Sequence, residues 1–391
     1  MTEKEKLKQA IDSVKKYGSI TEAAKKLKIP RKTLSGRYNK ALDLGYVADI
    51  PIIDTEDEVA IESKIKKINK ENRELRNKYN ELLRMNEEQR QQLSMFEVFE
   101  NKSDSIIADK IRKINNLKKN ESVAVLLYSD LHFEEMVDSR TVNGLNEYNP
   151  EIAKKRSNKF FENSLKLIEM TRSKSDIKKC ILWLGGDLIS GNIHEDLVET
   201  GAMSPIDSCL EVFELIVSGI NYLIDYGDLD ELIIPCSVGN HSRITKERRV
   251  ATNVQNSLEW MIYNFLVKYY REESKLKFNL TRSYHNLLDI DGYLIRFHHG
   301  EGIRYAGGVG GISIPFNKAI AQWNKAQKVN LDVAAHWHQR FSTEDLVING
   351  SIIGYNAYAM SIKASFEKPQ QAFFLVNSKR GKTIEAPIFV D

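Results

Sequence analysis

Asp130 and His132 carry side chains that suit metal binding, and they follow directly on an apolar stretch. Residues 123–128 (VAVLLY) are of types that favour a buried β-strand, and the next four residues are Ser-Asp-Leu-His. A carboxylate and a neutral imidazole on the loop that leaves a strand can converge on one divalent cation. Taken alone, this pair is explained more simply by an aspartate on a loop beside a histidine that packs in the core. Other stretches of the sequence must therefore decide whether the two residues bind a metal ion.

Four further apolar stretches end in the same way. Residues 181–187 end in Gly-Gly-Asp, where the glycines allow the backbone to pass close to a bound ion. Residues 232–241, 293–300 and 331–338 end in Gly-Asn-His, His-His-Gly and His-Trp-His. Five strands that each end in Asp, Asn or His are very improbable by chance, so they predict one site built from several loops.

Helical patterns separate these predicted strands, at residues 150–172, 205–226 and 252–270. Alternation of strands and helices predicts a layered α/β domain whose ligands gather at one edge of the sheets. Apolar runs at residues 372–376 and 387–390 are consistent with closing strands. Residues 101–120 are polar and basic, and we expect a helix there that leads into the first strand.

The order of the motifs resembles that of the calcineurin-like metallophosphoesterase superfamily, over residues 123 to 340. That order is Asp-x-His, Gly-Asp, Gly-Asn-His, His-Gly and His-x-His. The resemblance implies an α/β fold, a layered α/β/β/α sandwich over residues 121–391. The chain departs from the family pattern at Ala335, where glycine is usual, and at Ser242, where an acidic residue often follows Gly-Asn-His. Neither residue is a ligand, so these changes bear on local backbone shape and substrate class.

The same resemblance implies two divalent metal ions and a role for each motif residue. One ion would be held by Asp130, His132, Asp187 and His338, and the other by Asp187, Asn240, His299 and His336. Asp187 would bridge the ions, and His241 would be the catalytic residue that protonates the leaving oxygen. Two cations about 3.5 to 4 Å apart can neutralise a phosphodiester and generate hydroxide near neutral pH. Nitrogen and oxygen ligands together fit Mn²⁺, Fe, Zn²⁺ or Ni²⁺, and we expect Mn²⁺.

Other residues near the motifs allow more than one interpretation. Adjacent strand residues face opposite sides, so only one of His298 and His299 can face the ions, and the resemblance favours His299. His194 is as consistent with a surface position as with a substrate contact, and His285 is expected to be structural. Residues 307–311 (GGVGG) could form a flap or only a connection. The basic residues after His241 could guide a polyanion or form a solvated face; they are Arg243, Lys246, Arg248 and Arg249.

The composition is that of a globular protein, with 42% hydrophobic and 28% charged residues among 391. No run reaches the roughly 18 apolar residues of a membrane span, and the charged N-terminus lacks the apolar core of a signal peptide, so we expect a cytoplasmic protein without membrane contact. The three widely spaced cysteines argue against a disulfide framework. The formal net charge is only +3, but residues 1–50 hold 12 Lys or Arg against 6 Asp or Glu.

Residues 1–50 show three short helical patterns. The first is broken at Gly18, the second is expected at residues 22–27 with Thr21 as its cap, and the third follows Pro30 over residues 31–44. Residues 19–34 resemble a helix-turn-helix, although Lys28 stands where such turns often have glycine. We therefore expect a DNA-binding domain over residues 1–50.

The helix-turn-helix resemblance implies that the third helix enters the major groove of DNA. A small basic bundle used for protein contact is the alternative, but the crowding of basic residues on this helix favours DNA. The side chains expected to contact bases and phosphates are Arg31, Lys32, Thr33, Ser35, Arg37 and Lys40.

Residues 51–120 are predicted to contain a linker and a coiled coil. Residues 49–57 are acidic and include Pro51. Beyond them, seam residues alternate at four and three positions for about five heptads, from Ile61 to Phe96, without Gly or Pro. A single long helix that lies on the catalytic domain is the alternative. The narrow seam, with Asn72 as a residue that fixes register, favours a homodimer.

Three functions are compatible with this organisation. The first is a DNA-processing nuclease, because the motifs look similar to those of SbcD-type repair nucleases and the architecture resembles phage-encoded phosphoesterases with an N-terminal helix-turn-helix. The second is a phosphatase or nucleotide phosphodiesterase that acts on a small molecule or phosphoprotein, although residues 186–191 (GDLISG) lack the Asp-Arg-Gly of serine/threonine phosphatases. The third, an inactive DNA-binding regulator, is disfavoured because every ligand position is filled.

Overall fold

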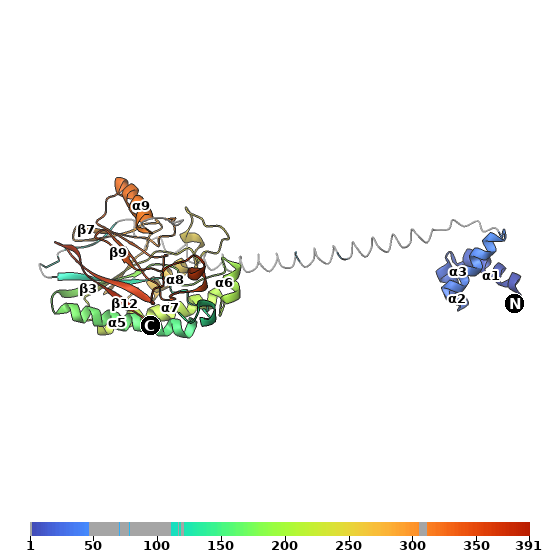
Figure 1. Cartoon of the computed structure of the whole chain (residues 1–391), viewed down its shortest axis with the longest axis horizontal. Helices are drawn as coiled ribbons and strands as arrows, with labels where there is room; N and C mark the ends of the chain where they lie inside the picture. Colours follow the sequence, from blue (N-terminus) through green and yellow to red (C-terminus); the bar gives the residue numbers. More distant parts are fainter. Residues whose placement is uncertain are drawn as a thin grey trace. The chain divides into compact units, whose positions relative to one another are not determined.

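The computed structural model describes residues 2–46, 70, 78, 111–115, 117–118, 121–304 and 311–391 (Figure 1). The chain divides into two compact units, Met1–Arg90 and Gln91–Asp391. Apart from residues 70 and 78, the predicted acidic linker and coiled coil over residues 49–96 lie outside the described residues, as do residues 307–310 of the glycine-rich stretch. The homodimer therefore stays a prediction.

The first unit contains the three expected helices, α1 (Glu3–Tyr17), α2 (Ile20–Leu27) and α3 (Arg31–Asp43). Thr2 and Glu5 form a capping box at the start of α1, and Gly18 ends it in a left-handed conformation. Apolar residues from all three helices form one buried cluster. The prediction that Thr21 caps α2 is wrong, because the helix begins at Ile20 and the Ser19 hydroxyl accepts the Glu22 N–H at 3.2 Å.

Lys28 ends α2 and makes the turn into α3. Its backbone is left-handed, with φ 56° and ψ 39°. Its N–H donates to the Lys25 carbonyl oxygen at 3.2 Å, and the Ile29 N–H donates to the Ala24 carbonyl oxygen at 3.2 Å. The turn therefore has the left-handed geometry in which glycine is common. Lys28 adopts this geometry although its Cβ makes the left-handed backbone unfavourable in free energy.

In the described part of the second unit, the strands form two sheets of six strands each. One has the order β1-β6-β7-β8-β10-β9, and its strands are Arg112–Ile114, Asn286–Ile290, Tyr293–Phe297, Leu331–Ala334, Leu346–Ile348 and Phe341–Ser342. The other has the order β12-β11-β2-β3-β4-β5, and its strands are Gly381–Phe389, Gln370–Asn377, Glu121–Tyr128, Asp176–Leu184, Glu231–Pro235 and Leu276–Asn279. Strands β2, β3, β4 and β5 run parallel, whereas β11 is antiparallel to β2.

Strand β2 is buried on both faces, which explains its unbroken run of apolar residues. Ala124, Leu126 and Tyr128 belong to a core cluster shared with helices, whereas Val125 and Leu127 belong to a second cluster that includes residues of the other sheet. The alternation of side chains along a strand thus places this strand between a helical layer and the opposing sheet.

Helices cover the outer faces of both sheets. α5 (Pro150–Arg172), α7 (Pro205–Tyr226) and α8 (Leu258–Tyr269) contribute to the core cluster on one sheet, and α9 (Ser313–Ala326) packs on the other through Phe316 and Ile320. Figure 1 shows α5 and α7 along one side of the sheets and α9 on the other. The short elements are η1 (Ser139–Val142), α6 (Glu195–Thr200), η2 (Val254–Asn256) and α10 (Ala357–Ser361). The predicted α/β/β/α sandwich is confirmed.

Two boundaries differ from the sequence prediction. The expected helix over residues 101–120 is wrong for its described part, because Arg112–Ile114 forms β1 and pairs in parallel with β6. The helix expected over residues 252–270 is divided into η2 and α8, because the Ser257 hydroxyl accepts the Trp260 N–H and starts a new helix. Among the described residues, no helix combines the length and apolarity needed to cross a membrane.

Replacement of Lys28 by glycine should stabilise the first unit by about 1 kcal/mol, because a non-glycine residue in the left-handed region costs roughly that much. The measurement is urea unfolding of a fragment of residues 1–50. The control is Lys26→Gly, at an exposed position inside α2, which should destabilise by about 1 kcal/mol. Destabilisation by both changes would contradict the left-handed turn.

Candidate metal centre

The loops that follow β2, β3 and β4 leave the same edge of one sheet, because these strands are parallel. Backbone hydrogen bonds join the first two loops side by side. The Asp130 N–H donates to the Gly186 carbonyl oxygen, and the His132 N–H donates to the Asp187 carbonyl oxygen, both at 3.0 Å. Three predicted ligands are thereby fixed relative to one another by main chain.

β7 and β8 bring the remaining histidines from the other sheet. These strands are also parallel, and the Ala335 N–H donates to the His299 carbonyl oxygen at 2.8 Å. The His336 N–H lies 3.2 Å from Asp130 Oδ1, to which it donates. The loops of the two sheets therefore meet at one place.

Two glycines allow the loops after β3 and β4 to touch. A Cβ on Gly186, whose φ is 87°, would lie 2.4 Å from the backbone nitrogen of Gly239. A Cβ on Gly239 would lie 2.1 Å from Asp187 Oδ1. No larger residue fits at either position, so the Gly-Gly-Asp and Gly-Asn-His sequences are explained by close contact of backbone with backbone and carboxylate.

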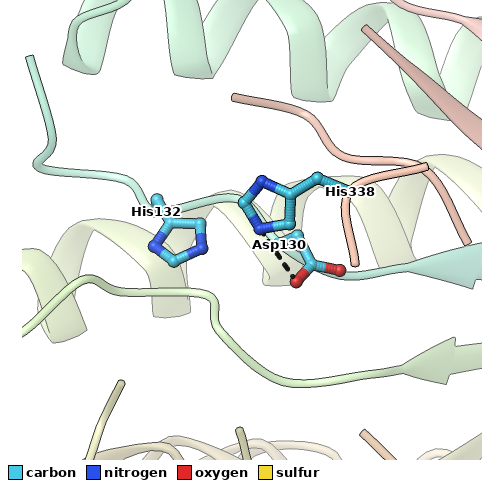
Figure 2. Close-up of side chains that lie close together, drawn as sticks. All are labelled: Asp130, His132 and His338. Carbon is cyan, nitrogen blue, oxygen red and sulfur yellow. Dashed lines mark ion pairs between the residues drawn. The ribbon is translucent and has the colours of Figure 1, made fainter. Parts of the chain in front are cut away.

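The potential ligand atoms form three groups, and within each group they lie within 4.8 Å of one another. The groups are Asp130, His132 and His338; Asp187, His299 and His336; and His132, Asp187 and His241. Figure 2 shows the first group, in which an ion pair joins Asp130 to His338 and the His132 ring lies beside them. The first two groups correspond to the two predicted ion sites. The third group adds His241, which was predicted to lie beside the ions.

Five of the predicted ligands have left-handed backbone. Their φ values lie between 48° and 75°, and in the described part of the chain only ten non-glycine residues have positive φ. The five are Asp130, His132, Asp187, His336 and His338. Such conformations cost about 1 to 3 kcal/mol each and persist only where the surrounding structure enforces them. Their concentration here indicates a site whose backbone is shaped to aim side chains.

His132 is oriented as a metal ligand would be. Its Nδ1 lies 2.9 Å from Ser190 Oγ, which donates its own proton to Glu135 Oε2 at 3.1 Å. Ser190 must therefore accept from His132, so Nδ1 carries the proton and Nε2 keeps its lone pair. His132 Nε2 is buried without a hydrogen-bond partner. Burial also holds the pKa of His132 well below its usual value, so the ring is neutral.

His299 and Asp187 face each other in a way that requires a cation. His299 Nδ1 lies 2.7 Å from the Gly185 carbonyl oxygen and donates to it, whereas Nε2 lies 2.9 Å from Asp187 Oδ2. A neutral ring would then direct a lone pair at a carboxylate oxygen, so a proton or a metal ion must lie between them. Burial opposes a charged ring, yet the Asp187 carboxylate outweighs it and raises the pKa of His299 well above its usual value.

His338 and His336 differ in their relation to the carboxylates. His338 Nε2 lies 3.3 Å from Asp130 Oδ1, and that carboxylate outweighs burial and raises the pKa of His338. Burial, with the neighbouring His299, lowers the pKa of His336 to about 3, so its ring is neutral and can donate a lone pair. The centre thus combines imidazole nitrogens with carboxylate oxygens, which is a donor set for divalent cations.

Asn240 and His241 are partly exposed residues of the loop after β4. Asn240 Oδ1 is buried without a hydrogen-bond partner, so its carbonyl oxygen is available as a ligand. The His241 N–H donates to Asp187 Oδ1 at 2.9 Å, and its ring nitrogen Nδ1 lies 3.2 Å from the Ser190 carbonyl oxygen. The His241 ring is therefore held at Nδ1, and Nε2 remains to act on a substrate.

Three other histidines take positions apart from the ligand groups. His298 lies on the opposite side from His299, beside Asp332 and with its ring centroid 5.0 Å from that of Trp323. His285 packs on the same tryptophan, at 4.5 Å between ring centroids. His194 lies closer to the ligand groups, with 6.4 Å between its ring centroid and that of His241.

The predicted DNA-contacting residues lie on or near the surface of α3. None of the six is buried, whereas Leu34, Tyr38 and Ala41 of the same helix pack into the core of the first unit. Lys40 forms an ion pair with Glu3, at 2.6 Å between Nζ and Oε1. The exposed face of α3 therefore keeps its positive character mainly near its N-terminal half.

Three buried residues beside the centre escaped prediction from the sequence. Ser190 and Glu135 hold His132, and Glu259 accepts hydrogen bonds from the loops after β3 and β4. Burial and the nearby Asp187 carboxylate raise the pKa of Glu259 to about 7. A signal for Glu259 was present, because it is the sole acidic residue in the apolar segment 258–267.

Comparisons with known proteins indicate a distant likeness. The sequence matches no protein-family model and no curated protein. Among solved structures, a predicted phosphoesterase from Streptococcus pneumoniae is 10% identical, with 68% of this chain and 98% of that chain covered and a TM-score of 0.26. Vacuolar protein sorting 29 from Cryptosporidium parvum is 12% identical, with 68% and 97% covered and a TM-score of 0.28.

A third similar structure is the sulfate thiohydrolase SoxB of Thermus thermophilus, at 9% identity, with 70% of this chain and 58% of that chain covered and a TM-score of 0.27. Likeness at this distance says nothing about substrate or reaction.

The described residues fit the binding of divalent cations. His132 Nε2 and Asn240 Oδ1 are buried atoms with a free lone pair and no hydrogen-bond partner. The Asp187 carboxylate faces Nε2 of the His299 ring. Asp187 belongs to the group of His299 and His336 and also to the group of His132 and His241, and His132 is in turn a member of the group of Asp130 and His338. A single carboxylate near both sites is what a bridging ligand requires.

Removal of the Asp187 side chain should lower the number of bound metal ions more than removal of one histidine ligand does. A bridging carboxylate binds both ions and offsets their repulsion. Metal analysis after dialysis should find about two ions per wild-type chain and well under two in Asp187→Ala. His336→Ala is the comparison and should retain more metal than Asp187→Ala. If Asp187→Ala retains both ions, the bridging role is wrong.

Proposed function

We propose that the chain is a dinuclear-metal phosphodiesterase that cleaves DNA and that its first unit recruits it to DNA. The proposal is carried by the position of Asp187, whose buried carboxylate is shared by ligand groups from both sheets. Manganese is the metal we expect, because imidazole and carboxylate ligands occur together. When bound, the two ions would neutralise the phosphate oxygens and generate a hydroxide near neutral pH.

The ligand loops supply the positions that such chemistry needs. Main-chain hydrogen bonds join the loops of Asp130 and Asp187, so the ligands are held before a substrate arrives. The Ser190 and Glu135 side chains fix the His132 tautomer. Because the ligands are already in position, they need not rearrange during the reaction, and the free-energy cost of that rearrangement is avoided.

His241 is placed to handle the proton of the leaving group. Its Nδ1 proton is directed at the Ser190 carbonyl oxygen, which leaves Nε2 to carry the second proton of an imidazolium. Transfer of that proton to the departing oxygen would avoid release of a basic alkoxide. Its backbone N–H meanwhile supports the Asp187 carboxylate.

The loop after His241 supports a polyanionic substrate. Arg243 donates to the Asn240 carbonyl oxygen within the loop, whereas Arg248 donates to the Glu301 carbonyl oxygen at 2.9 Å and so binds the loop to the segment that follows β7. Lys246 and Arg249 on the same loop are exposed. A loop that is held in place and carries exposed cations beside the centre suits a chain of phosphates better than a single one.

The first unit supplies a second, separate attraction to DNA. Arg31, Lys32 and Thr33 are exposed in the first turn of α3, directly after the left-handed turn at Lys28. The first turn of a recognition helix is where side chains reach base edges and phosphates. Deletion of this unit should therefore separate DNA affinity from hydrolysis.

Wild-type protein with Mn²⁺ should hydrolyse bis-p-nitrophenyl phosphate and linear DNA, duplex or single-stranded. A variant without residues 1–50 should hydrolyse the small diester equally well and bind DNA less tightly, with a weaker dependence of affinity on salt because fewer phosphate counterions are released. The measurements are hydrolysis rates and DNA affinity at several salt concentrations. Hydrolysis of p-nitrophenyl phosphate alone would overturn the nuclease proposal, and unchanged DNA affinity would reassign the first unit to protein contact.

His241→Ala should keep both metal ions and lose roughly 10²- to 10⁴-fold in turnover on DNA, because a general acid matters most for a basic leaving oxygen. The loss on bis-p-nitrophenyl phosphate should be much smaller, since p-nitrophenolate leaves without a proton. Single-turnover rates and metal content test both statements. Equal losses on the two substrates, or loss of an ion, would make His241 a ligand or a positioning residue, as its place in the third ligand group allows.

A further inference from the structure

Glu259 is a fully buried acidic residue in the first turn of α8. Its neighbours in the sequence are apolar, and the helix packs into the core beneath the ligand loops. An ionisable group in such a place costs several kcal/mol unless hydrogen bonds or charges compensate. The groups that donate hydrogen bonds to the Glu259 carboxylate therefore indicate why an acidic residue is present at this position.

Each carboxylate oxygen of Glu259 accepts one backbone hydrogen bond. Oε1 accepts from the Leu188 N–H at 2.6 Å, and Oε2 accepts from the Gly239 N–H at 2.7 Å. Both distances are at or below the short end for charge-assisted bonds, about 2.7 to 2.9 Å. One side chain thus joins the loop after β3 to the loop after β4.

The two donors stand next to predicted ligands. Leu188 directly follows Asp187, and Gly239 directly precedes Asn240. The loops also touch where a Cβ on Gly239 would meet Asp187 Oδ1 at 2.1 Å. A shift of either loop would therefore move the Asp187 carboxylate relative to the Asn240 amide.

We propose that Glu259 is a positioning residue of the metal centre, which fixes the Asp187 and Asn240 loops against each other. This inference rests on the proposed function. Groups that orient metal ligands in this way typically change metal affinity by about 10- to 100-fold. A residue that served only the stability of α8 would leave metal affinity unchanged.

Glu259→Gln is the sharpest test, because it preserves size and removes one acceptor. Glutamine can accept one of the two N–H groups, but its own amide N–H₂ would face the other. Titration of metal-free full-length protein with Mn²⁺ in a calorimeter should show affinity about 10- to 100-fold weaker than wild type. Amide hydrogen exchange at Leu188 or Gly239 in the metal-free protein should accelerate, because one of these N–H groups loses its partner.

Glu121→Gln is the matched control. The Glu121 carboxylate is also buried and accepts one backbone N–H, from Lys118 at 3.0 Å, together with the Lys179 ammonium at 2.7 Å. It lies at the start of β2, at the opposite end of the strand from Asp130. This variant should lose stability but keep the wild-type affinity for Mn²⁺.

The outcomes separate this inference from the proposed function. If wild-type protein binds no divalent ion, the proposed function fails and the role of Glu259 fails with it. If wild type binds Mn²⁺ and Glu259→Gln binds it equally well, only the role of Glu259 is overturned. Equal losses in Glu259→Gln and Glu121→Gln would also overturn it, because the effect would then be one of general stability.

Glu259→Asp covers the case in which the glutamine variant does not fold. Aspartate keeps the charge but is one methylene too short to reach both N–H groups. It should lose about tenfold in Mn²⁺ affinity. Unchanged affinity with unchanged hydrogen exchange at both loops would overturn the positioning role.

Discussion

The buried Asp187 carboxylate is the group on which the arrangement of the centre depends. One oxygen faces His299 Nε2 and the other accepts the His241 N–H, so it joins loops that leave β3, β4 and β7. An uncompensated buried anion costs several kcal/mol. The charged His299 ring compensates Asp187 where no metal ion is bound, and a bound cation would take the place of that proton. The electrostatics of the fold therefore favour the metal ions that the proposed chemistry needs.

The two sheets make this arrangement possible because they are rigid and run their ligand-bearing strands in the same direction. Left-handed backbone at five predicted ligands costs about 1 to 3 kcal/mol for each residue. These residues follow closely on the ends of β2, β3 and β8, so strands that are buried on both faces, such as β2, anchor them. A looser scaffold would relax the loops, and the imidazoles would turn away from the carboxylates.

Local sequence patterns predicted most of the fold. The bounds of α5 and α7 agree with the prediction because Asn149 and Ser204 cap them and a proline follows each cap. The strand β1 was missed because its pairing with β6 joins residues far apart in the chain, and nothing local to Arg112–Ile114 indicates it. Likewise, the ligand motifs predicted which side chains meet, whereas Ser190 contacts His132 across 58 residues of sequence. Contacts of this kind depend on how the loops pack, which no local pattern encodes.

The departure from the family pattern at Ser242 is explained by helix α8. Ser242 is buried and its hydroxyl lies 2.8 Å from that of Ser257, the residue that caps α8. The Leu258 N–H donates to the Ser242 carbonyl oxygen at 2.9 Å, so the start of the helix is fixed directly against the Gly-Asn-His loop. Glu259 then follows on the first turn, with its carboxylate on Gly239. An acidic residue, Glu259, thus lies beside the loop, but it belongs to α8 and not to the loop. Its position depends on the contact between Ser242 and Ser257.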